Sequence, residues 1–498
     1  MCYNANKEKV LMFYLFFSLL VVLIIGTSAV FTFIPKLNTL KSNKVINKSL
    51  KIGVIVFCAL FILSNFLPDI TNLCYSREEL LLTPVDSNLA LIKWFASASF
   101  VLLPLAVFYD NRTVRNLAIF FSLLAGFLQI VFYPQFLELF TSENGRGLNS
   151  IKVLSDSFKK FMINPTFRSI YFGVTVGLQI VIPMVLVISK KHIFNVKSLK
   201  EWGWFLLIGI ITFASSVPIT SLQHLFGHTD IIFTAWSIPH LIWLLLVVGQ
   251  IVCLYLLLKN KEYKIKRIAM FILALSLLSQ YSQIFGVISI SVKSIPLQLC
   301  NIGTFFVVIS LVTKNKKIFD FTVIVNLVGA MFALAVPELK DEGLFYVYNI
   351  YFCAEHGNVL IVPILCLMLK LFGRIDRKSL KNFLIGFNLY FFSVMALGII
   401  ANAIATKTGN DFWRANWFFM FDRETAADLI PFLGNLFNAQ IHIGVVTLYP
   451  VAKLIIYGVF SAVCFLAFGI IQLIYFISGK IKRKGDKTQS QETQKLNS

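Results

Sequence analysis

Residues 231–258 read IIFTAWSIPHLIWLLLVVGQIVCLYLLL, and the segment 259–267 that follows is rich in Lys and Arg. The stretch itself contains no Asp, Glu, Lys or Arg. About 20 consecutive apolar residues are enough for a helix to cross the hydrocarbon core of a bilayer. We therefore expect this stretch to span a membrane, with its basic flank on the cytoplasmic side.

Apolar stretches of this kind recur along the whole chain. The 498 residues are 57% hydrophobic and 14% charged, whereas soluble domains carry about 25% charged residues. We predict an all-α polytopic membrane protein with about 13 transmembrane helices, formed by one N-terminal helix plus two parallel six-helix repeats. The expected spans are 10–34, 51–67, 88–109, 116–139, 168–189, 203–219, 231–258, 267–290, 295–313, 319–336, 346–373, 382–405 and 449–478.

The basic residues indicate the topology. Lys and Arg are concentrated in every second connection, and the connections between them are neutral, mixed or acidic. Because excess Lys and Arg mark the cytoplasmic side, we expect a cytoplasmic C-terminus in the cell membrane and an outer N-terminus, with span 10–34 kept as an anchor. The abundance of Lys, Asn, Ile and Phe indicates a bacterial source.

The composition also limits the partners. The net charge of +21 comes from Lys and Arg in the loops between spans. We therefore expect membrane lipids as partners and no nucleic acid. The eight cysteines contain no CxxC pair, which excludes a disulfide framework, and each thiol taken alone is ordinarily a small buried hydrophobe. Nucleotide-binding and metalloprotease motifs are absent, and we predict no cofactor and no metal site. The oligomeric state stays open.

The chain contains a degenerate internal duplication. Ile170-Tyr171-Phe172 recurs as Ile350-Tyr351-Phe352, and Lys197-Ser198-Leu199-Lys200 recurs as Lys378-Ser379-Leu380-Lys381. We therefore divide the chain into an N-terminal anchor and basic loop (1–50), a degenerate first repeat (51–260), a second repeat (261–479) and a disordered cytoplasmic tail (480–498). Further matched pairs are Asn111 with Asn315, Gly126 with Gly329, Pro134 with Pro337, Gly177 with Gly357, and Pro183 with Pro363.

The two copies differ in chemistry. Cys300 and His356 stand in apolar spans near the predicted outer side, where a thiol and an imidazole can form an activated nucleophile and its base. The alternatives are an interhelical hydrogen bond for His356 and apolar filler for Cys300. The first copy lacks these groups: Cys300 aligns with Ala96 to within a residue, Glu355 with Thr175, and His356 with Val176.

Residues 265–478 resemble the YwaF-type integral membrane proteins and the related animal transmembrane protein 164. Leu297-Gln298-Leu299-Cys300 is similar to the family's Leu-His-Leu-Cys motif, with Gln298 where His is usual. Glu355-His356-Gly357 is similar to its Ser-His-Gly motif, with Glu355 in place of Ser. Asn402 and Thr408-Gly409-Asn410 resemble a later Asn and a Gly-Thr-Asn segment.

The resemblance implies a lipid acyltransferase, because the animal relative is known as one with a cysteine nucleophile. By this implication, Cys300 takes an acyl group from a phospholipid and His356 shuttles the proton. We therefore expect Cys300 and His356 to be catalytic. The candidate substrate-binding residues are Gln298, Glu355, Asn358, Asn402 and Asn410.

Two other functions stay open. A length near 500 residues and two six-helix halves also suit a secondary transporter, in which Gln179, Gln250, Gln283 and Gln298 would line a polar path. A non-catalytic scaffold is the third alternative.

Two smaller features each allow two interpretations. His224 and His228 have zinc-ligand spacing, but Gly227 lies between them, which favours a loop. The aromatic segment 406–448 is either an interfacial lid or an ordinary interfacial loop.

Overall fold

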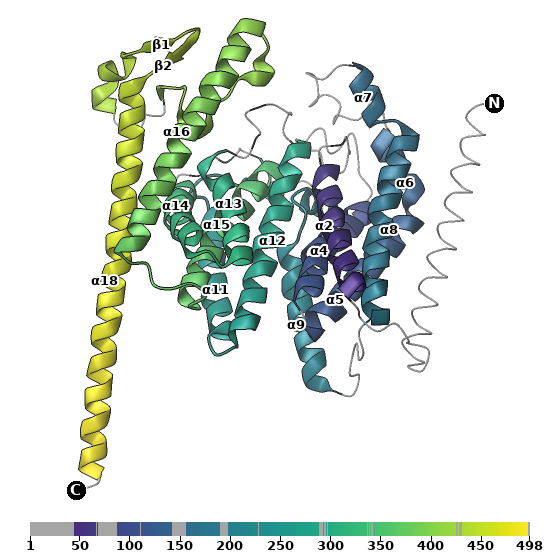
Figure 1. Cartoon of the computed structure of the whole chain (residues 1–498), viewed down its shortest axis with the longest axis horizontal. Coiled ribbons are helices and arrows are strands. Elements are labelled where there is room, and N and C mark those ends of the chain that lie inside the picture. Colours follow the sequence, from purple (N-terminus) through teal and green to yellow (C-terminus); the bar gives the residue numbers. More distant parts are fainter. Residues whose placement is uncertain are drawn as a thin grey trace, which may run out of the picture. The chain divides into compact units, whose positions relative to one another are not determined.

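The computed structural model of the chain is almost entirely helical (Figure 1). The structure describes residues 44–65, 67, 87–109, 111–141, 156–189, 198–227, 229–287, 292, 295, 297–335, 337, 339, 342–424, 427 and 431–496. The predicted span 10–34 lies outside these residues. The chain forms two compact units. Unit 1 takes its described residues from 1–252, 257–290 and 337–358, and unit 2 from 253–256, 291–336 and 359–498.

Unit 1 contains the helices of the predicted first repeat together with one and a half helices of the second. Two of its helices, α11 and α15, contribute residues to both units. In chain order the helices are α2 (Lys44–Ser64), α4 (Ser87–Phe108), α5 (Arg112–Val131), α6 (Tyr133–Thr141), α7 (Asp156–Met162), α8 (Pro165–Ser189), α9 (Leu199–Ser215), α10 (Ser221–Phe226), α11 (Ile238–Leu258), α12 (Tyr263–Val287) and the first half of α15 (Val347–Met368).

Unit 2 contains the rest of the second repeat, including a small two-stranded antiparallel sheet in which Ile441 pairs with Leu448. Its elements are α13 (Leu299–Thr313), α14 (Lys316–Ala335), the second half of α15, α16 (Arg377–Thr408), the 3-10 helices η5 (Asp411–Trp413), η6 (Trp417–Phe419) and η7 (Pro431–Asn438), strands β1 (Ile441–Ile443) and β2 (Val446–Leu448), and α18 (Pro450–Leu496).

Nine helices of the described chain are long and apolar enough to cross a membrane, namely α2, α4, α5, α8, α11, α14, α15, α16 and α18, and α13 is a shorter apolar helix. This confirms the prediction of an all-α polytopic membrane protein. A helix covers most of every predicted span from 51 onward. The bounds of the two units cut across the predicted division at 260, because α12 packs against α4, α9 and α2 in unit 1.

Two predicted segments differ from the structure. Span 116–139 is broken at Phe132, which caps α5, and α6 starts one residue later. Pro134 lies next to the break, and it has no backbone N–H with which to continue the α5 hydrogen bonds. The tail predicted to be disordered from 480 is instead helical to Leu496. Its Lys, Gln and Glu residues are good helix formers, so the helix of the last span extends into it.

Small residues let the helices of each unit approach closely. In unit 1, a Cβ atom at Gly126 of α5 would lie 2.5 Å from Ile180 of α8. In unit 2, a Cβ atom at Gly386 of α16 would lie 2.6 Å from the Phe321 ring of α14. Association of membrane helices relies on such packing, because lipid is as apolar as the side chains that it would replace.

In each unit, polar contacts join helices at one of their ends, and we call each set of contacts a polar fastening. In unit 1, Asn111 caps α5, and Arg112 bonds to Glu201 of α9 at 3.1 Å. In unit 2, Asn315 accepts hydrogen bonds from the first amides of α14. The next residue, Lys316, bonds to the carboxylate of Asp320 at 2.7 Å. These are matching positions of the predicted duplication.

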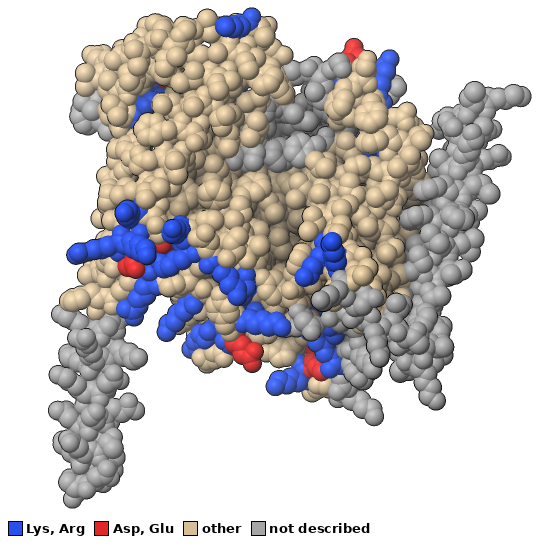
Figure 2. Space-filling model, viewed as in Figure 1, with Lys and Arg blue, Asp and Glu red and all other residues tan. Residues whose placement is uncertain are grey.

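The fastening in unit 2 ties α14 to α16. Lys316 also bonds to Ser379 at 2.7 Å, and Asn382 donates to the second oxygen of Asp320 at 2.9 Å. Asp376 caps α16, and the hydrogen bonds that it accepts from Ser379 hold the pKa of its carboxyl below the usual range. Exposed basic residues surround this point (Figure 2), namely Lys314, Lys317, Arg374, Arg377 and Lys378.

Asp320→Ala should destabilise the protein. Asp320 is fully buried, and its loss leaves Lys316 and Asn382 without their acceptor, at a cost of about 1–3 kcal/mol because Lys316 stays partly solvated. The midpoint of thermal unfolding in detergent measures the change. Asp156→Ala is the control, because Asp156 pairs with Lys159 at 90% side-chain exposure. We expect almost no shift there, and equal shifts for the two variants would contradict this account.

Candidate functional site

Cys300 lies at the start of a helix in unit 2. It is the second residue of α13 and is half-buried, whereas Cys353, Cys366 and Cys464 are buried. Gln298 is the N-cap residue, but its side chain makes no capping hydrogen bond to α13. Cys300 is therefore one residue from the N-terminal end of α13, with its side chain partly accessible.

The thiol faces a tight crossing of α13 and α14. A Cβ atom at Gly329 would lie 3.4 Å from Sγ of Cys300, and one at Gly303 would overlap the side chain of Asn326. Gly303 is one turn after Cys300 on α13, and Asn326 is one turn before Gly329 on α14. In this antiparallel register, Asn326 therefore lies about one helical turn, roughly 4.5 Å, from the level of the thiol.

Asn326 is an unusual residue at this crossing. It is fully buried, and neither its Nδ2 nor its Oδ1 has a hydrogen-bond partner among the described residues. A buried amide without a partner costs free energy, and it calls for an explanation. A donor near a cysteine nucleophile is a candidate for stabilising an oxyanion.

Gln298 holds a loop beside the start of α13. Its Oε1 accepts from the amide of Phe418 at 2.9 Å, and its Nε2 donates to the carbonyl of Asn416 at 3.4 Å. The hydroxyl of Tyr390 on α16 donates to the carbonyl of Leu297 at 2.9 Å. The amide of Gln298 therefore binds protein backbone, and its predicted role in substrate binding stays a prediction.

Asn402 and Lys453 hold the same loop from α16 and α18. Asn402 donates to the carbonyl of Ala415 at 2.8 Å and accepts from the Ala415 amide at 3.2 Å. The ammonium of Lys453, which is buried, donates to the carbonyls of Phe419 and Asp422. We call residues 415–422 the clamped loop, because α13, α16 and α18 each contribute a side chain that bonds to its backbone.

The clamped loop is strained. Phe418 and Phe419 have φ values of 51° and 54°, a left-handed conformation that costs non-glycine residues about 1–3 kcal/mol each. Trp417 and Phe418 are buried, and Phe419 is exposed. Asn410, predicted to bind substrate, lies outside the loop: it is exposed and caps η5. The role of segment 406–448 as an interfacial lid stays a prediction.

His356 lies in the part of α15 that belongs to unit 1. It is half-buried, and its Nδ1 lies 2.8 Å from the carbonyl oxygen of Phe352. Because a carbonyl only accepts, Nδ1 carries the proton of the neutral ring, and Nε2 keeps its lone pair. The ring also packs against that of Phe352, with centroids 4.2 Å apart. This tautomer is the one that a general base requires at Nε2.

Glu355 points to a different environment. It is buried at 3% exposure, its Oε1 has no hydrogen-bond partner among the described residues, and Tyr351 bonds to the carboxyl group. It therefore does not orient the imidazole, which the Phe352 carbonyl holds. Asn358 is half-buried on the same helix. The substrate-binding roles of Glu355 and Asn358 stay predictions.

Cys300 belongs to unit 2, and His356 belongs to unit 1. The structure brings Cys300 together with Gly329 and with the neighbourhood of Asn326. The side chains of Gln298 and Asn402 both bond to the backbone of the clamped loop. The proximity of the thiol and the imidazole stays a prediction.

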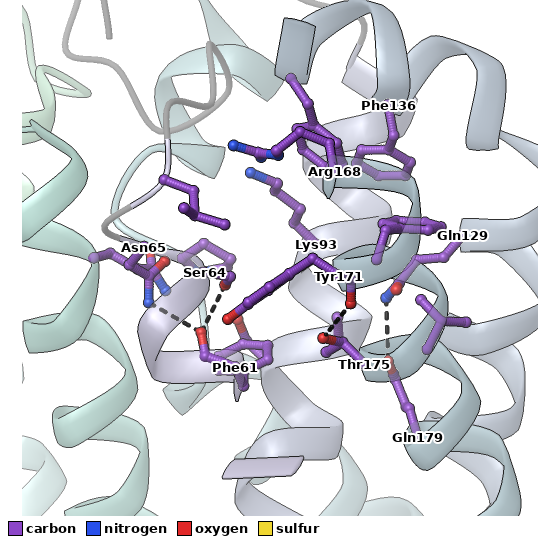
Figure 3. A pocket seen from close by; sticks show the side chains of 18 residues that line it. Phe61, Ser64, Asn65, Lys93, Gln129, Phe136, Arg168, Tyr171, Thr175 and Gln179 are labelled. Atoms are coloured by element: carbon purple, nitrogen blue, oxygen red, sulfur yellow. Dashed lines mark hydrogen bonds between the residues drawn. The ribbon is translucent and has the colours of Figure 1, made fainter. Parts of the chain in front are cut away.

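Unit 1 contains a cavity at the positions that the duplication matches to the candidate site (Figure 3). Its volume is about 110 Å³. Ala96, Thr175 and Val176 line it, and these residues align with Cys300, Glu355 and His356. Gln179 and Gln283, two residues of the predicted polar path, line the same cavity.

Of the two histidines with zinc-ligand spacing, the structure describes one. His224 is buried on α10, and His228 lies outside the described residues. Within the part of the chain that the structure describes, no group of three or more His, Cys, Asp or Glu side chains could hold a metal ion.

Asn326, Lys453 and the clamped loop are not predicted from the sequence. A lone Lys near the start of the span 449–478 was the available signal for Lys453, since a charge in a span marks a specific contact. The register that sets Asn326 near Cys300 depends on the packing of α13 on α14, and no sequence pattern revealed it.

Comparison with known families agrees with the resemblance in the second half of the chain. The model of the TMEM164 family matches residues 232–455. This confirms the expected relation to transmembrane protein 164, and the match begins upstream of the predicted 265. The likeness to YwaF-type proteins stays a prediction. A search of curated proteins and a search of solved structures each found no significant match to the chain.

Gln298→Ala should release the clamped loop. The variant removes two bonds to a strained backbone, so amides 416–419 should exchange hydrogen for deuterium at least tenfold faster, as the loss of about 1.4 kcal/mol of local stability predicts. Hydrogen exchange with mass spectrometry measures this. Asn410→Ala removes an amide that caps η5 outside the loop, and it should leave residues 416–419 unchanged. Unchanged exchange in Gln298→Ala would contradict the clamp.

Proposed function

We propose that this multi-pass membrane protein is an acyl-transfer enzyme, in which Cys300 accepts an acyl group from a phospholipid and His356 moves the proton. The proposal takes its reaction type from what the resemblance to the animal relative implies, and the family match over residues 232–455 supports that resemblance. It takes the assignment of roles from the local geometry of the two residues.

The observation that carries the proposal is the cavity in unit 1. Ala96 and Val176 come from α4 and α8, yet both line one cavity. If the second repeat has the same internal arrangement, their counterparts Cys300 and His356 line one cavity as well. The matched polar fastenings at Arg112 and Lys316 support this use of the duplication.

The local chemistry of each residue fits its role. Cys300 is partly accessible and lies at a helix start, whereas a fully buried thiol could not reach a substrate. His356 carries its proton on Nδ1 and has Nε2 available as a base. The other described cysteines that share an apolar helix with a candidate site residue, such as Cys353, are buried.

The reaction proceeds in two balanced steps. Nε2 of His356 takes the thiol proton, and Sγ of Cys300 attacks the ester carbonyl of the phospholipid. The tetrahedral intermediate expels the lysophospholipid alkoxide, which takes the proton from His356, and a thioester remains on Cys300. An acceptor alcohol then loses its proton to His356 and attacks the thioester. The product ester leaves, and the thiolate recovers the proton.

Asn326 would stabilise the oxyanion in both steps. Its amide is buried, lies near the level of the thiol and has no hydrogen-bond partner among the described residues. A donor of this kind gains a partner only when negative charge develops on the carbonyl oxygen. This role accounts for a buried amide that otherwise only costs stability.

The acyl-enzyme can be trapped directly. We would place the purified full-length protein in nanodiscs with a phospholipid whose acyl chain ends in an alkyne, and then attach a fluorophore to the chain on denatured protein. We expect a label that hydroxylamine removes, as a thioester requires. Cys300→Ala should lose the label, and His356→Gln should form it about 10²–10⁴-fold more slowly.

Cys253→Ala is the matched control, because Cys253 is an exposed thiol on an apolar helix. This variant should be labelled like the unaltered protein. If Cys300→Ala keeps the label, or if the unaltered protein acquires none, the acyl-transfer function is excluded. The transporter and the scaffold, which need no reactive thiol, would then be the functions left.

Asn326→Leu should separate a catalytic role from a structural one. We expect thioester formation to slow by about 10²–10³-fold, as for loss of one oxyanion donor. The midpoint of thermal unfolding should stay equal or rise, because an apolar group of similar size replaces an amide without a partner. A lower midpoint with an unchanged rate would assign Asn326 to the fold alone.

A further inference from the structure

The cavity in unit 1 has a charged end that the acyl-transfer proposal does not use. Lys93 and Arg168 both line it, and in Figure 3 their charged ends point towards the same end of the cavity. Arg168 is buried at 4% exposure, with its guanidinium 4.4 Å from the centre of the Phe140 ring. Among the described residues, the lining contains these two cations and no carboxylate.

The position of the two cations is unusual for a membrane protein. Lys93 lies in the second turn of α4 and Arg168 in the first turn of α8. The fastening cation Arg112 lies at the opposite end of the α4–α5 hairpin, as does Lys51, which lies over the Phe108 ring. Lys93 and Arg168 therefore do not belong to the group of basic residues near Arg112 and Lys51. Ionisable groups within spans are costly and by default mark a functional site.

The rest of the cavity is amphipathic. Phe136 and Phe172, which pack with ring centroids 5.8 Å apart, form an apolar wall. Gln129 donates to Gln179 at 3.3 Å, and Gln179 donates to Ser99 at 3.2 Å. Both glutamines line the cavity and are buried. This hydrogen-bonded row fixes their amide groups and adds a polar strip to the lining of the cavity.

We propose that this cavity binds the phosphate group of an amphiphile, with the phosphate between Lys93 and Arg168 and the apolar chain along the aromatic wall. Arg and Lys together are suited to phosphate, since guanidinium binds it through paired hydrogen bonds and ammonium acts as a point charge. A volume of about 110 Å³ exceeds the roughly 10–15 Å³ that one water needs, so a headgroup fits.

The proposal does not depend on acyl transfer at Cys300. Apart from Gln283, the residues that line the cavity belong to the first repeat, and all of them are in unit 1. It lies upstream of the match to the TMEM164 family except for Gln283. Cys300→Ala should therefore bind the same ligand with unchanged affinity, which separates failure of this proposal from failure of the proposed function.

Calorimetric titration of the full-length protein in a phosphate-free maltoside detergent tests the site. Dodecyl phosphate is the probe, dodecyl glucoside is the uncharged analogue of the same chain length, and inorganic phosphate is the free anion. We expect dodecyl phosphate to bind at least tenfold more tightly than dodecyl glucoside. Tight binding of inorganic phosphate would assign a free phosphate, and its failure to bind would assign the amphiphile.

Variants identify the binding residues. Arg168→Gln and Lys93→Gln should each weaken dodecyl phosphate binding about tenfold or more, as expected for loss of a charged hydrogen bond. Arg168→Lys, which keeps the charge if Arg168→Gln fails to fold, should weaken it less. Ala96→Leu, which fills the cavity without changing charge, should also weaken binding. Lys160→Gln removes an exposed cation on α7, and it should change affinity by less than twofold.

Two results would overturn the proposal. One is equal affinity of the unaltered protein for dodecyl phosphate and dodecyl glucoside. The other is a loss of binding in Lys160→Gln as large as in Arg168→Gln. That result would show that dodecyl phosphate is attracted to positive charge in general and not to this cavity.

Discussion

A polar side chain in an apolar helix must find its partner within the protein, because lipid offers none, and this constraint governs both units. The helix ends in unit 1 are joined by Arg112 and Glu201, and those in unit 2 by the bonds of Lys316 to Ser379 and of Asn382 to Asp320. Lys453 meets the same constraint through the backbone of the clamped loop. In each case the contact fixes a helix against another element, so the few polar groups determine an arrangement that apolar packing alone would leave less specific.

The exceptions to this constraint are informative. Asn326 is buried without a hydrogen-bond partner in the described part of the chain, and so is one oxygen of Glu355. Both lie within one residue or one helical turn of the level of a candidate catalytic group. Real proteins accept such local costs chiefly at functional sites, and the strained Phe418 and Phe419 beside the start of α13 follow the same pattern. The candidate site thus contains a clear departure from this rule at Asn326, whose two polar side-chain atoms both lack a hydrogen-bond partner among the described residues.

The sequence predicted the spans well, because length and hydropathy decide whether a helix can cross a membrane. It missed the break at Phe132 and the helical tail to Leu496, since both depend on local backbone bonding that hydropathy does not report. Cys300 and His356 stood out as polar groups in apolar runs. Asn326 and the bonds of Gln298 to the clamped loop did not, because they depend on the register of α13 against α14 and on a loop more than 100 residues away in the chain.

The proposed acyl transfer requires Cys300 and His356 to share one site. The most direct measurement uses a chain in which Cys300 is the single native cysteine and a second thiol is introduced by His356→Cys. Dibromobimane, which becomes fluorescent only when it bridges two thiols, should then label the protein, and the thiol of Asn358→Cys, on another face of the helix, should give much less bridging. Bridging at Asn358→Cys without bridging at His356→Cys would contradict the account.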